Sequence, residues 1–245
     1  MERKGVAIFR QFGRPLLLGE GGGLQAGCRR HPELRYASSV TERTTSTPLP
    51  RGDSRLIQIT NAALADATRR SGEWLVCRPG CTQCCVGVFA INQLDALRLQ
   101  HGLAELEKID SPRVTRIRAR VRDSIRRLST LFPGNARTGV LDDGPVAEER
   151  FANFANDEVC PVLDPTTGLC DLYDARPMTC RTFGPPVRSE GGLGVCELCY
   201  HGATDDQIAA CEMVVDTDEL ESELVRKTEQ ARKITGSTIV TFALR

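Results

Sequence analysis

The sequence predicts a mainly α-helical protein with little β-structure, in which a single helical domain surrounds an irregular cysteine-rich centre. Two observations lead to this prediction. Apolar residues recur at helical spacing in several long segments. The chain of 245 residues also carries 11 cysteines, most of them in loops rich in Pro and Gly. The domain is expected over residues 51–245. Residues 1–50, with a glycine run and a stretch rich in Ser, Thr and Pro, are expected to form a poorly ordered N-terminal extension.

Apolar spacing and capping signals predict helices over residues 53–70, 92–106, 111 to just before Pro133, 146–156, 204–213 and 217–233. Asp53 or Ser54 is the expected cap of the first helix. Ser111, followed by Pro112, is the expected cap of the third. The last two helices each open with a Thr-Asp pair, which is typical of a helix start. Residues 237–244 alternate and are rich in Thr, Ile and Val, which predicts a terminal strand.

The charge balance gives no reason to expect nucleic acid or an anionic membrane as a partner. Lys plus Arg and Asp plus Glu number 32 each, so the net charge is +0. The basic side of the third predicted helix is therefore interpreted as a solvated face. Its arginines are Arg116, Arg118, Arg120, Arg122, Arg126 and Arg127.

The expected location is the cytoplasm, with the cysteines reduced. The apolar stretches near the N-terminus are short and interrupted by Arg10 and Arg14, which is not typical of a signal peptide. No segment approaches the apolar length of a membrane span. Reduced cysteines in a cytoplasmic chain indicate metal binding or redox chemistry.

The first cysteine block contains Cys77, Cys81, Cys84 and Cys85. The Pro-Gly pair between the first two predicts a turn, and thiolates two or three residues apart on a turn can converge on one metal ion. Neighbouring side chains of a regular strand or helix point in different directions. Cys84 and Cys85 can therefore serve one site only if the backbone bends there; otherwise they serve two metals, or one of them is not a ligand. The spacing of the first three cysteines also matches the radical S-adenosylmethionine signature, but the alternating strands and helices of those enzymes are not predicted here.

The second cysteine block contains Cys160, Cys170, Cys180, Cys196 and Cys199. A strong turn signal at residues 164–168 predicts that the chain doubles back and brings the first two of these together. The last two form a CxxC pair, a spacing that also occurs in zinc knuckles.

Other residues near the second block are candidates of a different kind. Arg176 and Arg181 are expected to donate to thiolate sulfur, because a guanidinium offsets the negative charge that several thiolates leave on one metal. His201 is a further possible ligand, although a lone histidine is more often a surface or packing residue. Cys211 is interpreted as a core residue, and Cys28 is not assigned to the site.

Together the two blocks resemble the YkgJ-type cysteine-cluster family, the CxxCxxCC zinc- or iron-chelating domains. The resemblance covers roughly residues 75–199. In this chain three residues, not two, separate the first two cysteines. The resemblance implies a metal-chelating domain, and the family also looks related to flagellin lysine N-methylases. The matching residues are Cys77, Cys81, Cys84, Cys85, Cys160, Pro161, Leu163, Gly168, Cys170, Tyr173, Arg176, Pro177, Cys180, Arg181 and Phe183.

The function expected from these features is metal binding, with an iron–sulfur cluster, expected to be 4Fe–4S, or zinc held by the nine cysteines of the two blocks. More than four thiols favour a cluster or two metals over a single closed zinc site. Two alternatives stay open: a protein-modifying enzyme of the lysine N-methylase type that uses the cluster, and a thiol-redox protein. The sequence identifies no catalytic residue, substrate or protein partner.

Overall fold

The computed structural model of the chain describes residues 47–189 and 192–245. Within them the protein is mainly α-helical, as predicted, with eight α-helices and two small sheets of two strands each. Most of the predicted N-terminal extension, residues 1–46 with Cys28, lies outside the described residues. Among the helices that are described, none combines the length and the apolar character needed to cross a bilayer.

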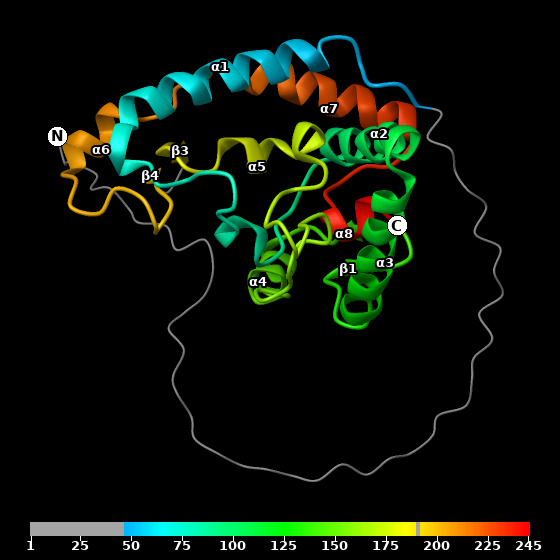
Figure 1. Cartoon of the computed structure of the whole chain (residues 1–245). Helices are drawn as coiled ribbons and strands as arrows, with labels where there is room; N and C mark the ends of the chain where they lie inside the picture. Colours follow the sequence, from blue (N-terminus) through cyan, green and yellow to red (C-terminus); the bar gives the residue numbers. More distant parts are fainter. Residues whose placement is uncertain (1–46, 190–191) are drawn as a thin grey trace, which may run out of the picture.

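Four long helices build the body of the fold: α1 (Asp53–Ser71), α2 (Gln93–Ile109), α3 (Ser111–Leu128) and α7 (Asp218–Arg232). In Figure 1, α7 runs beside α1 along one edge of the molecule, and α2 packs against both α3 and α7. The short C-terminal helix α8 (Val240–Ala243) lies against α2 and α3. Apolar side chains of these three helices form a continuous core, which includes Leu99, Ile117 and Val240.

The remaining elements are short. After α3 come the paired strands β1 (Gly134–Asn135) and β2 (Val140–Leu141), and then α4 (Pro145–Ala152). Helix α5 (Met178–Thr182) lies near the middle of the molecule (Figure 1). Figure 1 also shows a group of small elements at the end of α1, which we call the small lobe (residues 187–189 and 192–211). It contains β3 (Val187–Ser189), β4 (Gly192–Gly194) and α6 (Asp205–Ala210).

The six predicted helices all occur, whereas α5 and α8 were not predicted as helices. Two capping assignments were wrong. Gly52, with a φ of 104°, precedes α1, and the Asp53 carboxylate is buried against an arginine instead of capping the helix. At the start of α3 the cap is Asp110, whose carboxylate accepts the N–H of Arg113 at 3.0 Å. Ser111 is already the first helical residue, and its hydroxyl donates to Glu107.

The predicted terminal strand at residues 237–244 was also wrong. Thr238 alone pairs as a strand would, with Ile91. The chain then turns into α8, whose four residues are all buried. A short helix that is buried on every side needs no alternation of polar and apolar residues. The apparent alternation in the sequence therefore had no structural meaning here.

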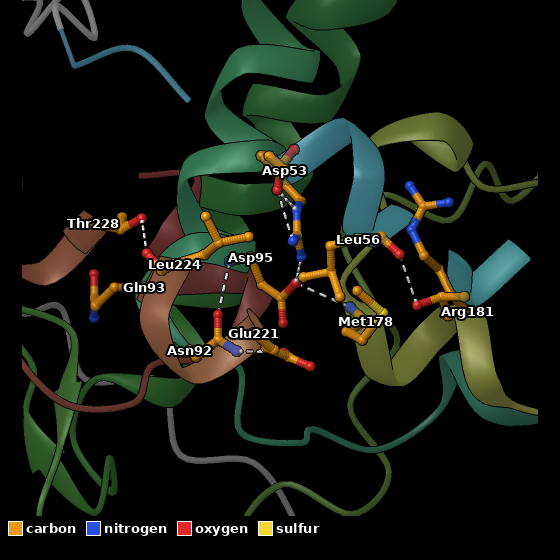
Figure 2. Close-up of polar contacts among 12 residues, drawn as sticks. Asp53, Leu56, Asn92, Gln93, Asp95, Met178, Arg181, Glu221, Leu224 and Thr228 are labelled. Carbon is orange, nitrogen blue, oxygen red and sulfur yellow. Dashed lines mark hydrogen bonds and ion pairs between the residues drawn. The ribbon is translucent and has the colours of Figure 1, made fainter. Parts of the chain in front are cut away.

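A buried ion network ties α5 to α1 and α2 (Figure 2). Arg98 is 4% exposed and donates to Asp53 at 2.7 Å and to Asp95 at 2.6 Å. Asp95 also accepts the backbone N–H of Met178, the first residue of α5, at 2.9 Å. Burial raises the pKa of Asp95 to about 6, against the lowering effect of Arg98. The network fixes the start of a helix whose third residue is Cys180.

A close backbone approach fixes the segment before α5. Tyr173–Ala175 forms a single 3₁₀ turn, η3, that packs against α2 at Gly102. A Cβ atom at position 102 would lie 2.3 Å from the Cβ of Ala175. Glycine is therefore required at position 102, although glycine in a helix interior ordinarily costs stability.

Replacing Gly102 by Ala is expected to lower the free energy of unfolding by about 1–3 kcal/mol through overpacking. In an uncrowded helix the same change would raise it by about 0.5–1 kcal/mol, so the sign of the effect is diagnostic. Urea unfolding of Gly102→Ala and of the double variant with Ala175→Gly measures both values. The second change should recover most of the loss. A stabilised Gly102→Ala would contradict the close approach.

The raised pKa of Asp95 predicts a pH dependence of stability. Because its folded pKa lies above the ordinary value of 3.8, the stabilisation is fully present below 3.8 and is lost as pH rises through about 6. Linkage gives a loss of about 1.4 kcal/mol between about pH 5 and pH 7.5. The difference in unfolding free energy between the native chain and Asp95→Asn should fall by this amount over that range. A constant difference would mean that Asp95 ionises as it does in the unfolded chain.

Candidate metal centre

The first cysteine block is folded into two consecutive turns. The N–H of Cys81 donates to the C=O of Arg78 at 2.9 Å, and Gly80 has a φ of 92°. The sequence predicted a turn here, and with proline and then glycine at its central positions the turn matches type II. Gln83–Cys85 then forms a 3₁₀ turn, η2, in which the N–H of Cys85 donates to Thr82 at 2.8 Å. Within this turn the thiols of Cys84 and Cys85 are hydrogen-bonded to each other.

The second cysteine block begins with a tight hairpin. The N–H of Gly168 donates to the C=O of Asp164 at 2.9 Å, and the side chain of Asp164 accepts further bonds within the turn. Leu163 and Cys170 are paired across the two arms of the hairpin. The predicted doubling back of the chain, which brings Cys160 toward Cys170, is confirmed.

The two blocks are joined through their backbones. The N–H of Cys160 donates to the C=O of Cys85 at 2.8 Å, and Val86 pairs with Val159. Cys160 and Cys170 also pack against the core of α2, α3 and α8. Together with Cys180 on α5, these residues make up what we call the five-cysteine group: Cys84, Cys85, Cys160, Cys170 and Cys180.

The thiols of the five-cysteine group influence one another electrostatically. A hydrogen bond with Cys84 raises the pKa of Cys85, as do burial and the nearby Cys160 and Cys170. Burial, followed by Cys170 and Cys84, raises the pKa of Cys160 to about 12. The pKa of Cys180 is also raised, by burial and then by the other thiols. Forming several thiolates here without a cation is therefore unfavourable.

Arg176 is the guanidinium that acts on these thiols. It stacks over the Tyr173 ring at 3.9 Å, and its buried Nε has no hydrogen-bond partner among the described residues. The pKa of Cys84 is lowered to about 7, chiefly by its hydrogen bond with Cys85 and also by the charge of Arg176. The same charge opposes the effect of burial at Cys170.

Arg181, the second predicted donor to sulfur, is placed differently. It is 4% exposed, and its guanidinium donates to the C=O of Asp174 and lies 3.5 Å from the side-chain oxygen of Asn61. These contacts tie α5 to η3 and to α1. Of the two arginines, Arg176 is thus the one that the structure brings to the thiols.

A second set of thiols, the four-cysteine group, lies toward the small lobe and consists of Cys77, Cys81, Cys196 and Cys199. Burial raises the pKa of Cys77 to about 11, with further contributions from Cys81, Cys84, Cys199 and Cys196. Cys196 has a raised pKa for the same reasons: burial first, then Cys199 and, more weakly, Cys81.

The other candidates take no part in either group. His201 is exposed. Cys211 is 2% exposed, lies at the end of α6, and donates its thiol to the C=O of Arg70 at 3.4 Å. The interpretation of Cys211 as a core residue is confirmed.

The arginines of α3 have a role that the sequence interpretation missed. Arg113 and Arg120 each donate to the buried carboxylate of Asp171 at 2.5 Å, and Arg120 also donates to the C=O of Pro161 at 2.8 Å. Arg127 pairs with Glu158 at 2.6 Å, just before the hairpin. Interpreting this face as solvated was therefore wrong for Arg120, whereas Arg127 pairs with Glu158 but keeps a side chain that is 58% exposed. The i, i+7 spacing of Arg113 and Arg120, which places them on one helix face, was the available signal.

The donor set fits zinc or iron better than hard cations. The ten described cysteines are free thiols, and sulfur ligands select zinc and iron–sulfur clusters over magnesium and calcium. As the side chains lie, no three Cys, His, Asp or Glu residues within 47–189 and 192–245 are arranged to hold one ion. The fold thus makes the thiols neighbours without bringing them to coordination distance of a common point. Metal binding would have to deprotonate and gather them, as is usual for thiolate sites.

One comparison with known proteins gives a match. A family model described as "CxxCxxCC: Putative zinc- or iron-chelating domain" matches residues 76–212, which is more than half of the chain and includes both cysteine groups. No curated protein and no solved structure matches the chain.

Replacing Asp171 by Asn is expected to lower the free energy of unfolding by about 2–3 kcal/mol, because two charge-assisted bonds to a buried carboxylate are lost. The matched control is Asp123→Asn on α3, whose pair with Arg126 is exposed and should contribute less than about 1 kcal/mol. Urea unfolding measures both. Equal effects of the two variants would contradict a special role for Asp171.

Proposed function

The chain belongs to the CxxCxxCC family of zinc- or iron-chelating domains, and from this premise we propose that its five-cysteine group holds an iron–sulfur cluster. The observation that carries the proposal is the backbone bond between Cys85 and Cys160 at 2.8 Å. It joins two cysteine blocks that are far apart in the sequence. Cysteines lie at or beside this bond in both blocks, which supports a common site.

The number and setting of these thiols support a cluster. A 4Fe–4S cluster takes four cysteine ligands, and the group contains enough thiols to supply them from η2, the hairpin and α5. When bound, such a cluster supplies one-electron transfer. Arg176 would offset the negative charge of the thiolates, and its unpartnered Nε is available to donate toward sulfur.

The surroundings of the group limit its movement. Asp171, next to Cys170, is clamped by α3, and the start of α5 is fixed by Asp95. Cys160 lies at a surface hollow of about 170 Å³ whose lining also includes Arg120 and Arg127. The protein thus holds these cysteines on a rigid framework, with the hollow beside Cys160.

The test is purification without oxygen, followed by visible absorption and by analysis of iron and acid-labile sulfide. A 4Fe–4S cluster gives a brown protein with about four iron and about four sulfide per chain. Alanine substitution of Cys160 or Cys170 should remove most of the iron. The control Cys211→Ala changes a buried thiol outside the group and should retain it.

Two results would count against the cluster. A colourless protein that carries only zinc would mean that the five thiols serve a zinc site. A folded protein that is free of metal would contradict metal binding by this chain and would favour thiol-redox chemistry.

A further inference from the structure

We infer that one side of α3, together with the segment that leads into the neighbouring hairpin, is the docking surface of an acidic one-electron carrier protein. The inference rests on the proposed function, because such a carrier is needed only if the five-cysteine group holds a cluster that exchanges electrons. We call this surface the arginine face. It consists of Arg113, Arg116, Arg120 and Arg127 of α3 and of Val159 and Leu163 of the segment beside it.

The four arginines lie along one side of α3. Arg113, Arg120 and Arg127 follow one another at intervals of seven residues, so they lie within about 40° of each other around the helix axis. Arg116 falls with them in a sector of about 60°. It is exposed and has no partner among the residues that the structure describes. The four cations therefore form one row along the helix.

The ion pairs of these arginines leave positive charge at the surface. In the pair of Arg127 with Glu158, the arginine side chain is 58% exposed and the glutamate side chain 10%. In the pairs that Arg113 and Arg120 make with Asp171, the arginine side chains are 34% and 24% exposed, whereas the aspartate is 3% exposed. The buried carboxylates thus hold the guanidinium groups in place, and the cations are the part that a partner meets.

The charge of this region differs from that of the whole chain. Helix α3 carries seven arginines and one acidic residue, Asp123, whereas segment 158–171 carries three acidic residues and no Lys or Arg. The surplus is positive, although the net charge of the chain is +0. The acidic groups nearest to solvent are already engaged, since Asp123 pairs with Arg126 and Asp164 accepts bonds within its own turn. The arginine face therefore attracts a protein whose docking surface is acidic.

A hollow of about 170 Å³ supplies the apolar part of the arginine face. Helix α3 contributes Arg120, Asp123 and Arg127 to its lining, and the opposite wall is apolar, with Val159, Leu163 and Pro165. Val159 is 50% exposed, which is unusual for a large apolar side chain. A pocket with apolar walls and arginines at its edge is typical of the centre of a protein–protein interface, where an apolar side chain of the partner is inserted.

The hollow lies beside a proposed ligand of the cluster. Cys160 is part of its lining, between the exposed Val159 and Pro161, whose C=O accepts a hydrogen bond from Arg120. A carrier that docks here would bring its own redox centre to the side of the protein on which a cluster ligand lies nearest to the surface. Electron-transfer complexes are small and short-lived, and a small apolar patch with charges around it suits such a complex.

The inference is tested by titrating the full-length protein, purified without oxygen, with two acidic carriers, a plant-type 2Fe–2S ferredoxin and a flavodoxin. Calorimetry is expected to show about one carrier bound per chain, with an affinity that falls about tenfold when the salt is raised from about 0.01 M to about 0.15 M. Cytochrome c, a basic carrier, should not bind. Failure of both acidic carriers to bind would overturn the inference, as would binding of a DNA oligonucleotide in their place.

Two charge reversals on different sides of α3 form a matched pair. Arg116→Glu alters the arginine face, whereas Arg122→Glu makes the same change about 120° away around the helix. Both arginines are exposed and have no partner in the described part of the chain, so both variants should fold and keep their iron. Arg116→Glu should weaken the binding of each carrier about tenfold, and Arg122→Glu by less than about twofold. Equal effects of the two variants would refute the arginine face.

Iron content and carrier binding together separate this inference from the proposed function. A protein that holds iron and sulfide but binds neither acidic carrier would refute the arginine face and leave the cluster standing. A protein without iron that still binds the carriers, and loses them in Arg116→Glu, would refute the cluster and keep the docking surface.

Discussion

The carboxylate of Asp171 is the point on which the placement of the second cysteine block depends. Two guanidinium groups of α3 hold it, and one of them also binds the C=O of Pro161 on the opposite arm of the hairpin. A loop rich in proline and glycine has little structure of its own to orient cysteines. Here helix α3 contacts both arms of the hairpin. The positions of Cys160 and Cys170 are therefore fixed relative to the helical body.

The same arrangement recurs around the other cysteine segments. Asp95 accepts a hydrogen bond from the first residue of α5. The absence of a side chain at Gly102 lets η3 pack closely against α2. The backbones of Trp74 and Tyr200 are hydrogen-bonded beside the small lobe. In each case the anchor is a backbone contact or a buried charge outside the thiols themselves. The approximate position of each cysteine is therefore determined by the fold before any metal contributes.

The sequence predicted the helical elements well because their apolar periodicity is long and regular, and it predicted both cysteine turns because proline, glycine and aspartate have strong local preferences. Caps were harder: Asp110 and Ser111 are adjacent and equally capable, and tertiary contacts decide between them. The division of the thiols into two groups could not be predicted from the sequence. It depends on contacts such as Gln83 with Glu197, across more than a hundred residues, that no local pattern encodes.

The order of the cysteines along the chain has a consequence for biosynthesis. The first block supplies thiols to both groups, whereas the five-cysteine group is complete once Cys180 has been made and the four-cysteine group only at Cys199. Both are complete before α7, which covers α1 and α2, leaves the ribosome. Since a nascent chain folds as it emerges, the thiols can meet while this flank of the body is still open. Helix α7 then closes over a framework whose sulfur-bearing segments are already in place.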